Sequence, residues 1–250
     1  MDDAELLAVL HRATDAVVGA LGAHDDWGPS GRRHGQYVSD LAADQAALDV
    51  LHGAGLRVLS EESGLDEGDG PVAVLDPLDG STNASRALPW FATSLCVVDD
   101  DGPLVAVVHD HPASVRFDAV RGGGARRNGE PLAPRGPVDL AESIVVVNAL
   151  PDRWAGWDQF RCMGAAALDL CAVADGRFDA FIDYDVDALG PWDYLGGLLV
   201  CREVGIEVVD AFGRDLVVLE HSARRTPVAA PPSMLAALVT ARADVGRTES

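Results

Sequence analysis

The chain has 250 residues, of which 48% are hydrophobic and 24% charged, a balance typical of a folded protein with a substantial core. Its 40 acidic residues outnumber 19 basic residues, all of them arginine, and the formal net charge is −21. Such a charge disfavours binding to nucleic acid or to an anionic membrane. The sequence has no apolar run of membrane-helix length and begins with acidic residues, unlike a signal peptide, so we expect a cytoplasmic protein.

The first half of the chain predicts two helices followed by an antiparallel meander. Apolar residues recur at helical spacing over residues 3–22 and 40–52. A short strand over residues 57–60 comes next and ends at the acidic pair Glu61-Glu62. Further apolar segments, separated by turns rich in Asp and Gly, predict strands over residues 72–75, 91–98, 104–109 and 116–120.

The second half alternates predicted strands and helices, which favours an α/β layer. The strands are expected over residues 144–148, 180–183 and 207–209, and the helices over 165–174 and 192–204. The four cysteines lack the spacing of a metal finger and have apolar flanks. We therefore expect small core residues at Cys96, Cys162, Cys171 and Cys201.

The strongest chemical signal is the segment of residues 76–83, Asp-Pro-Leu-Asp-Gly-Ser-Thr-Asn, directly after an apolar strand. Asp76 and Asp79 can point into one cavity from a strand end, and Mg²⁺ prefers carboxylate and carbonyl oxygens. The backbone carbonyl of Leu78 is a third candidate donor. Taken alone, an Asp-Pro-x-Asp-Gly sequence is as readily explained as an acidic surface turn, but the buried-looking strand and the polar residues that follow favour a site.

Phosphate binding is the second function that this segment predicts. Gly80, Ser81 and Thr82 offer backbone N–H groups and hydroxyls where a helix can begin, an arrangement that suits phosphate oxygens. Two other acidic features, Glu61-Glu62 and Asp193, would be ordinary surface or helix-terminal charges if they stood alone. Only in combination with residues 76–83 do these acidic residues indicate a binding site.

Together these motifs resemble the inositol monophosphatase family, within the superfamily that includes fructose-1,6-bisphosphatase. Residues 76–83 resemble the first family signature and residues 191–197, Pro-Trp-Asp-Tyr-Leu-Gly-Gly, resemble the second. The remaining matches occur in family order, at Asp44, at residues 60–63, at residues 121–125 and at residues 162–167. The resemblance implies a layered αβαβα sandwich of α/β class. It also implies an N-terminal part over residues 1–135 that carries the metal signature and a C-terminal part over 136–250 that completes the site.

The resemblance implies a role for each matched residue. Glu62, Asp76 and the Leu78 carbonyl would hold one Mg²⁺, while Asp76, Asp79 and Asp193 would hold another. A water activated by the cation would attack the phosphate, oriented by Glu62 and Ser81, with Asp44 supporting the hydroxyl. The phosphate would lie on Gly80, Ser81 and Thr82. The rest of the substrate would contact Asp79, Ala166, Asp187 and Asp193.

The substrate side departs from the family pattern. Members that take inositol phosphates commonly carry a glutamate seven residues before the second-signature aspartate, where this chain has Val186. Asp185 or Asp187 is the alternative contact, and Ala165 replaces the usual Ser or Thr. The loop with Arg32, Arg33 and His34 is either solvated or a source of positive charge for a second anionic group of the substrate.

The sequence thus predicts a Mg²⁺-dependent phosphatase for a small soluble ester such as an inositol monophosphate or a sugar phosphate. Fructose 1,6-bisphosphate, histidinol phosphate and 3′-phosphoadenosine nucleotides are alternative substrates. A regulatory protein that binds metal and polyol phosphate without turnover is the alternative from another class. The resemblance further implies a homodimer and inhibition by lithium.

Overall fold

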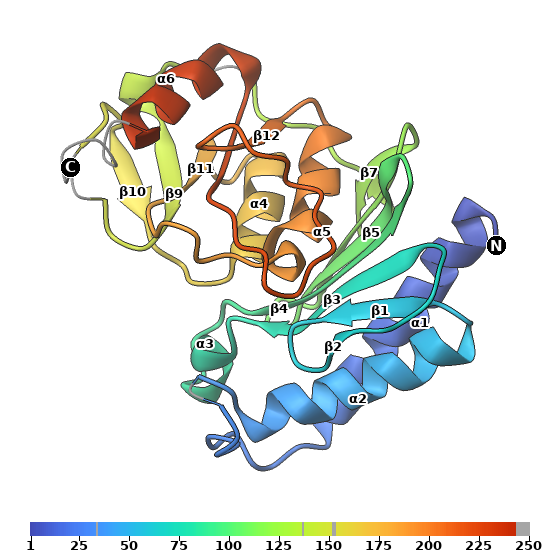
Figure 1. Cartoon of the computed structure of the whole chain (residues 1–250). Helices are drawn as coiled ribbons and strands as arrows, with labels where there is room; N and C mark the ends of the chain where they lie inside the picture. The colour runs from blue at the N-terminus through green and yellow to red at the C-terminus, as the bar shows by residue number, and fades with distance from the viewer. Residues whose placement is uncertain (34, 137, 152–153, 244–250) are drawn as a thin grey trace.

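The computed structural model describes residues 1–33, 35–136, 138–151 and 154–243. Two β-sheets alternate with three layers of helices, so the chain forms the predicted αβαβα sandwich (Figure 1). The helices are α1 (Asp3–Gly22), α2 (Val38–Gly53), α3 (Ser81–Ser85), α4 (Ala166–Ala174), α5 (Pro191–Arg202) and α6 (Pro232–Ala243), with a 3₁₀ turn, η1, at Leu140–Glu142.

The first sheet has the strand order β2-β1-β3-β4-β5-β6-β7-β8. Its strands are β1 (Arg57–Ser60), β2 (Gly64–Leu65), β3 (Val72–Asp79), β4 (Ala92–Asp99), β5 (Gly102–Asp110), β6 (Val115–Val120), β7 (Gly124–Arg127) and β8 (Glu130–Pro131). The expected antiparallel meander is confirmed from β3 to β6 and continues through β7 and β8. Only β1 and β3 pair in parallel in the described sheet.

Strand alternation divides the first sheet between two hydrophobic cores. On β3, Ala73 and Leu75 pack with α1 and α2, whereas Val72 and Val74 pack on the side of α4 and α5. Side chains of successive strand residues point to opposite faces, so a fully apolar strand such as this one can be buried on both sides. The end of β3 is therefore held firmly between two helical layers.

The second sheet has the order β10-β9-β11-β13-β12 and lies between the α4–α5 layer and α6 (Figure 1). Its strands are β9 (Ile144–Asn148), β10 (Gln159–Arg161), β11 (Ala180–Asp183), β12 (Glu207–Asp210) and β13 (Pro227–Ala230). Strand β13 runs antiparallel to both of its neighbours. Neither β13 nor α6 was predicted, because a strand of only four residues next to a Pro-Pro pair gives a weak sequence signal.

Close packing in the helical layer between the sheets depends on the glycine pair of α5. A Cβ atom on Gly197 would lie 2.6 Å from the Cβ of Leu170 and 2.9 Å from the carbonyl oxygen of Ala167. A Cβ on Gly196 would lie 2.6 Å from the Ser94 hydroxyl. Only glycine permits this approach, which fixes the start of α5 against both α4 and the first sheet.

Other sequence expectations have mixed outcomes. Three of the cysteines are buried as predicted, but the prediction for Cys162 is wrong, because it is exposed just before α4. None of the helices in the described part of the chain is long and apolar enough to cross a bilayer. The division into parts at residue 135 stays a prediction.

Candidate active site

The first element of the site is the end of β3, where Asp76 and Asp79 lie buried on either side of a shift in strand register. Oδ1 of Asp76 accepts a hydrogen bond of 3.0 Å from the backbone N–H of Leu78. The hydroxyl of Thr93 donates to the carbonyl oxygen of Pro77 at 2.9 Å. These contacts stabilise a bend that no regular strand would adopt, and the two carboxylates come close together there.

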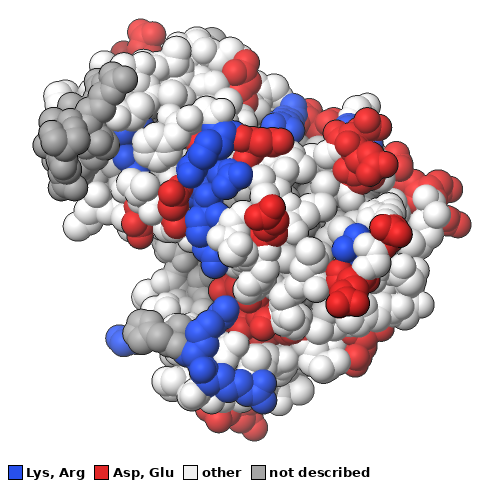
Figure 2. Space-filling view, viewed as in Figure 1, with Lys and Arg blue, Asp and Glu red and all other residues white. Residues whose placement is uncertain are grey.

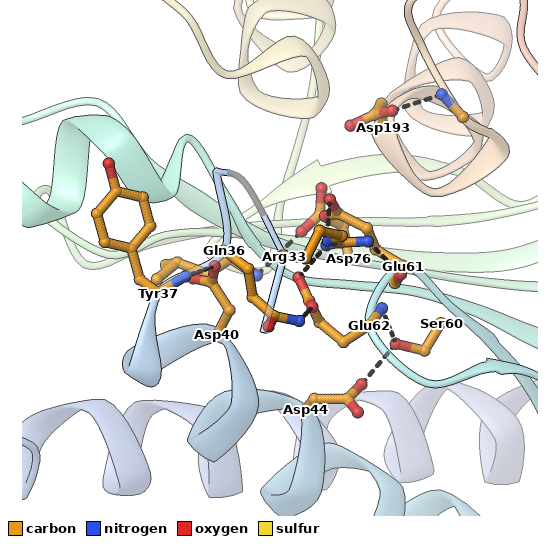
Figure 3. Close-up of polar contacts among 12 residues, drawn as sticks. Arg33, Gln36, Tyr37, Asp40, Asp44, Ser60, Glu61, Glu62, Asp76 and Asp193 are labelled. Atoms are coloured by element: carbon orange, nitrogen blue, oxygen red, sulfur yellow. Dashed lines mark hydrogen bonds and ion pairs between the residues drawn. The ribbon is translucent and has the colours of Figure 1, made fainter. Parts of the chain in front are cut away.

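Two helix starts complete the cluster. The backbone N–H of Ala167, in the first turn of α4, donates to Oδ2 of Asp79 at 2.8 Å. In the first turn of α5, Oδ2 of Asp193 accepts from the backbone N–H of Gly190 at 2.6 Å. One carboxylate oxygen from each of Asp76, Asp79 and Asp193 lies within 4.8 Å of the others. Figure 3 shows Asp193 across a gap from Asp76.

Burial and mutual repulsion destabilise the ionised forms of these acids. Burial, followed by the charges of Glu61, Asp79 and Asp193, raises the pKa of Asp76 well above its usual range. Burial raises the pKa of Asp79 to about 7, although three backbone N–H groups at the start of α4 oppose the shift. Burial and the nearby charge of Glu61 also raise the pKa of Asp193. The cluster therefore has an excess of negative charge that a cation would relieve.

The donor set fits a hard divalent cation. Oδ2 of Asp76 is buried and has no hydrogen-bond partner. A buried carboxylate oxygen without a partner is costly unless an ion binds it. Oxygen donors from three carboxylates are the ligands that Mg²⁺ and Ca²⁺ prefer.

The acidic pair after β1 lies beside this cluster and is held from the α1–α2 loop. Arg33 Nη2 contacts Glu62 Oε1 at 2.9 Å and Glu61 Oε1 at 3.2 Å. The side-chain amide of Gln36 donates to the other oxygen of Glu62, whose side chain is only 2% exposed. Burial and the charge of Glu62 raise the pKa of Glu61 to about 7. Sequence reasoning left the role of Arg33 open, and Arg32 is exposed, whereas His34 lies outside the described residues.

A hydrogen-bonded chain connects α2 to the acidic pair (Figure 3). The Ser60 hydroxyl donates to Oδ1 of Asp44 and accepts from the backbone N–H of Glu62 at 3.0 Å. Burial raises the pKa of Asp44, and hydrogen bonds from serine hydroxyls oppose that shift. By sequence alone Asp44 is an ordinary acidic residue on a helix. In the structure it faces the site from below the first sheet. One turn earlier on the same helix, burial raises the pKa of Asp40 to about 7.

Of the predicted phosphate-binding residues, Gly80 lies between β3 and α3, and Ser81 and Thr82 are the first residues of α3. Gly80 has a φ of 84°, and a Cβ there would lie 3.1 Å from the carbonyl oxygens of both Trp90 and Gly164. The Asn83 amide donates to the carbonyl oxygens of Trp90 and Met163 at 2.8 Å. These contacts fix the turn. Ser81 is half-buried and Thr82 is exposed, with its hydroxyl 3.3 Å from the Tyr37 hydroxyl.

The substrate-side residues lie in and near the β11–α5 loop. The Asp187 carboxylate pairs with Arg214 at 2.7 Å, and Arg214 also binds Asp210 at 2.8 Å. Val186 is 53% exposed, and Asp185 is exposed beside it. Ala166 and Ala165 are buried at the start of α4. The alternative polyol contact, Asp187, is thus already neutralised by an arginine.

Sequence reasoning missed a loop from the C-terminal part that reaches the site. The ring of His221 packs against Trp192 in a tilted arrangement with 5.0 Å between centroids, and its Nε2 lies 3.1 Å from the Glu61 carbonyl oxygen. The Arg224 guanidinium lies over the same Trp192 ring, with 5.0 Å between its central carbon and the ring centroid. The only sequence signal was a basic pair, Arg224-Arg225, without a recognised motif.

A sequence model of the inositol monophosphatase family matches residues 38–246. The chain belongs to this family. Members of the inositol monophosphatase family hydrolyse phosphate monoesters, so the predicted family, fold and enzyme class are confirmed.

Similar proteins include some that are named phosphatases and others that are named Nus factors. The chain is 36% identical to Nus factor SuhB of Escherichia coli over 192 residues, which cover 70% of this chain and 71% of that protein. It is 34% identical to a fructose-1,6-bisphosphatase/inositol-1-monophosphatase of Archaeoglobus fulgidus over 184 residues, 72% of this chain and 71% of the relative. The solved inositol monophosphatase of Anabaena superposes with a TM-score of 0.78 at 26% identity, covering 95% of this chain and 94% of its own.

Proposed function

We propose that this protein is a Mg²⁺-dependent phosphatase of a small sugar or polyol phosphate, with an inositol monophosphate or a related ester as substrate. The observation that carries the proposal is the convergence of Asp76, Asp79 and Asp193, with one buried Asp76 oxygen left without a partner. Membership of the phosphatase family supports the reaction, and the oxygen-only donor set supports Mg²⁺.

Asp76, Asp79 and Asp193 would hold one cation, and Glu62, Asp76 and the Leu78 carbonyl would hold another. When bound, Mg²⁺ supplies positive charge that offsets the carboxylates and the phosphate and makes a nearby water more acidic. The protein's part is to fix these ligands before the reaction. The backbone N–H groups at the starts of α4 and α5 orient Asp79 and Asp193, and the N–H of Leu78 orients Asp76.

The remaining residues would bind the phosphate and orient the attacking water. Gly80, Ser81 and Thr82 offer donors to phosphate oxygens from a turn that Asn83 rigidifies. Glu62 and the Ser81 hydroxyl would position the water, and the Glu62 carboxylate would accept its proton. Asp44 would keep the Ser60 hydroxyl directed so that Ser60 in turn holds the backbone of Glu62.

The names of two similar proteins point to substrates other than inositol phosphates. The Pyrococcus furiosus relative, 30% identical over 198 residues, is named a fructose-1,6-bisphosphatase, and a Staphylococcus aureus neighbour with a TM-score of 0.70 binds 2′-AMP. The Nus factor name of other relatives raises the non-enzyme alternative, a partner in transcription. An intact acidic cluster favours turnover over binding alone, and the net charge of −21 disfavours contact with RNA.

Phosphate release from a substrate panel, with and without Mg²⁺, tests the proposal. The panel comprises inositol 1-phosphate, fructose 1,6-bisphosphate, histidinol phosphate and a 3′-phosphoadenosine nucleotide. We expect Mg²⁺-dependent release from a sugar or polyol ester. Release that is unaffected by removal of divalent cations, or no release from any ester despite Mg²⁺ binding, would contradict it.

We expect three further properties because the chain resembles inositol phosphatases. We expect a homodimer, which light scattering would test, and a cytoplasmic location, which fractionation would test. We also expect millimolar Li⁺ to inhibit turnover by competing at the acidic cluster. Inhibition curves at several Mg²⁺ concentrations check this, with Na⁺ at the same ionic strength as the control. Insensitivity to Li⁺ would indicate a metal site unlike the one proposed.

A further inference from the structure

Two arginine-bearing loops approach the acidic cluster from opposite sides. Arg33, on the α1–α2 loop, donates from Nη1 to the carbonyl oxygen of Glu61 at 3.2 Å, and His221 lies 3.1 Å from the same oxygen. The two loops therefore meet at one backbone atom beside the cluster. Figure 2 shows positive side chains gathered above and below a recess in which acidic atoms are visible. In a protein of net charge −21, this concentration of positive charge requires a cause.

The arginines of these loops differ in how far their charge is already used. Arg33 is paired with Glu61 and Glu62, and Arg214 with Asp187 and Asp210. Arg224 makes its hydrogen bonds from Nη1 to the carbonyl oxygens of His221 and Ala223, at 2.9 and 2.8 Å. No carboxylate among the described residues forms an ion pair with it. Arg224 thus keeps a net positive charge that is held in place rather than neutralised.

The position of Arg224 is fixed beside the metal-binding cluster. Its guanidinium lies over Trp192, the residue before Asp193, and stacking on an aromatic face immobilises an arginine at low cost. Arg224 is half-buried, so part of the residue remains accessible to solvent.

The neighbours of Arg224 indicate which part of the substrate it would meet. The next residue, Arg225, pairs through its backbone with Leu189, and Thr226 accepts from the backbone N–H of Asp187 at 3.1 Å. Arg224 therefore lies alongside the β11–α5 loop, where the family resemblance puts the contact to the non-phosphate part of the substrate. On that loop the acidic contact is missing at Val186, and Arg214 neutralises Asp187.

We propose that Arg224 binds a second anionic group of the substrate, so that the enzyme prefers phosphate monoesters that carry another phosphate or a carboxylate. The scissile phosphate would lie on the Gly80–Thr82 turn, and the second group would lie against Arg224. A guanidinium is well suited to either group, because both accept two parallel hydrogen bonds. This inference rests on the proposed phosphatase activity and narrows its substrate class.

Matched substrate pairs test the preference. Fructose 1,6-bisphosphate is compared with fructose 1-phosphate, and 3-phosphoglycerate with glycerol 3-phosphate, since each pair differs by one anionic group. We expect the wild-type protein to favour the doubly anionic member of at least one pair. Arg224→Met should raise KM for that member by about 10- to 100-fold, the loss expected for a hydrogen-bonded charge, and leave kcat within a few-fold.

Control variants separate a direct contact from general charge effects. Arg12→Met removes an exposed arginine from α1, below the first sheet, and should leave both KM values unchanged. An equal loss on both members of a pair in Arg224→Met would overturn the inference, because it would put Arg224 on the shared phosphate. Preference for the singly anionic esters would overturn it too, while leaving the proposed phosphatase intact. Absence of hydrolysis for every ester would instead reject the proposed function itself.

Discussion

The negative charges of the acidic cluster, here called the floor of the site, are compensated differently from those at its edge, here called the rim. On the floor, Asp76, Asp79 and Asp193 face one another and are oriented by backbone N–H groups, and none of them forms an ion pair with an arginine in the described part of the chain. At the rim, Glu61 and Asp187 are each paired with an arginine. Arginine cannot lose its charge at physiological pH, so the rim carries its own neutralisation, whereas the floor must obtain a cation from solution. Metal binding and substrate selection are therefore separable in this molecule.

The largest effect is expected from removing a floor ligand. Asp76→Asn should reduce kcat/KM by about 10³-fold or more, because loss of cation-based charge stabilisation costs several kcal/mol of transition-state stabilisation. Phosphate release and Mg²⁺ calorimetry are the measurements. Asp118→Asn, at a buried acid of β6 outside the site, is the matched control. Near-normal activity of Asp76→Asn would place the metal elsewhere.

A smaller effect should come from the chain that supports the floor from α2. Ser60→Ala removes the hydroxyl that links Asp44 to the backbone of Glu62, and groups that orient metal-site residues typically contribute 10- to 100-fold. We expect kcat to fall by about 10-fold with KM little changed. Ser143→Ala, at a buried serine near η1, should behave like the wild type. A rise in KM alone would show that Ser60 acts on substrate binding instead.

The smallest effect is one of stability with pH. Because the pKa values of Asp40, Glu61 and Asp79 are raised to about 7, the folded chain binds protons that the unfolded chain has released above about pH 4. Without divalent cations, stability should therefore be highest at low pH within this window and fall as pH rises from about 4 to about 7. We expect a loss of at least about 1 kcal/mol, equivalent to about 2–4 °C in Tm.

Thermal melts with and without Mg²⁺ check this expectation. Protons and Mg²⁺ compete for the same carboxylates, so Mg²⁺ should raise Tm more at pH 8 than at pH 5.5. In Asp76→Asn the Mg²⁺ effect should disappear and the metal-free Tm at pH 8 should rise. An equal Mg²⁺ effect at both pH values would mean that the floor carboxylates are ionised throughout.

The floor was open to prediction because its parts are local in sequence. Asp76 and Asp79 belong to one short segment after an apolar strand, and Asp193 stands behind a proline at a helix start. Helix α1 and strands β1, β9 and β11 have the predicted bounds, since their hydrophobic patterns have clear ends. Whether the proposed ligands bind metal stays a prediction.

The rim was beyond sequence reasoning because its contacts join distant residues. Arg33 and Glu62 are 29 positions apart, and His221 and Glu61 are 160 positions apart. Such contacts depend on where loops lie after the sheets have packed, which no periodicity encodes. Strand β13, whose C-terminal neighbour is a proline pair, was missed for a related reason: its pairing with β11 and β12 is what makes it a strand.

The one exposed thiol has a practical consequence. Three cysteines are buried, so a thiol-reactive dye or spin label should attach to the unmodified chain at Cys162 alone. The carbonyl oxygen of its neighbour Met163 accepts a hydrogen bond from the side-chain amide of Asn83, in the turn proposed to receive the phosphate. A probe at this position would therefore sense whether that turn is occupied, and binding could be followed spectroscopically without altering a single site residue.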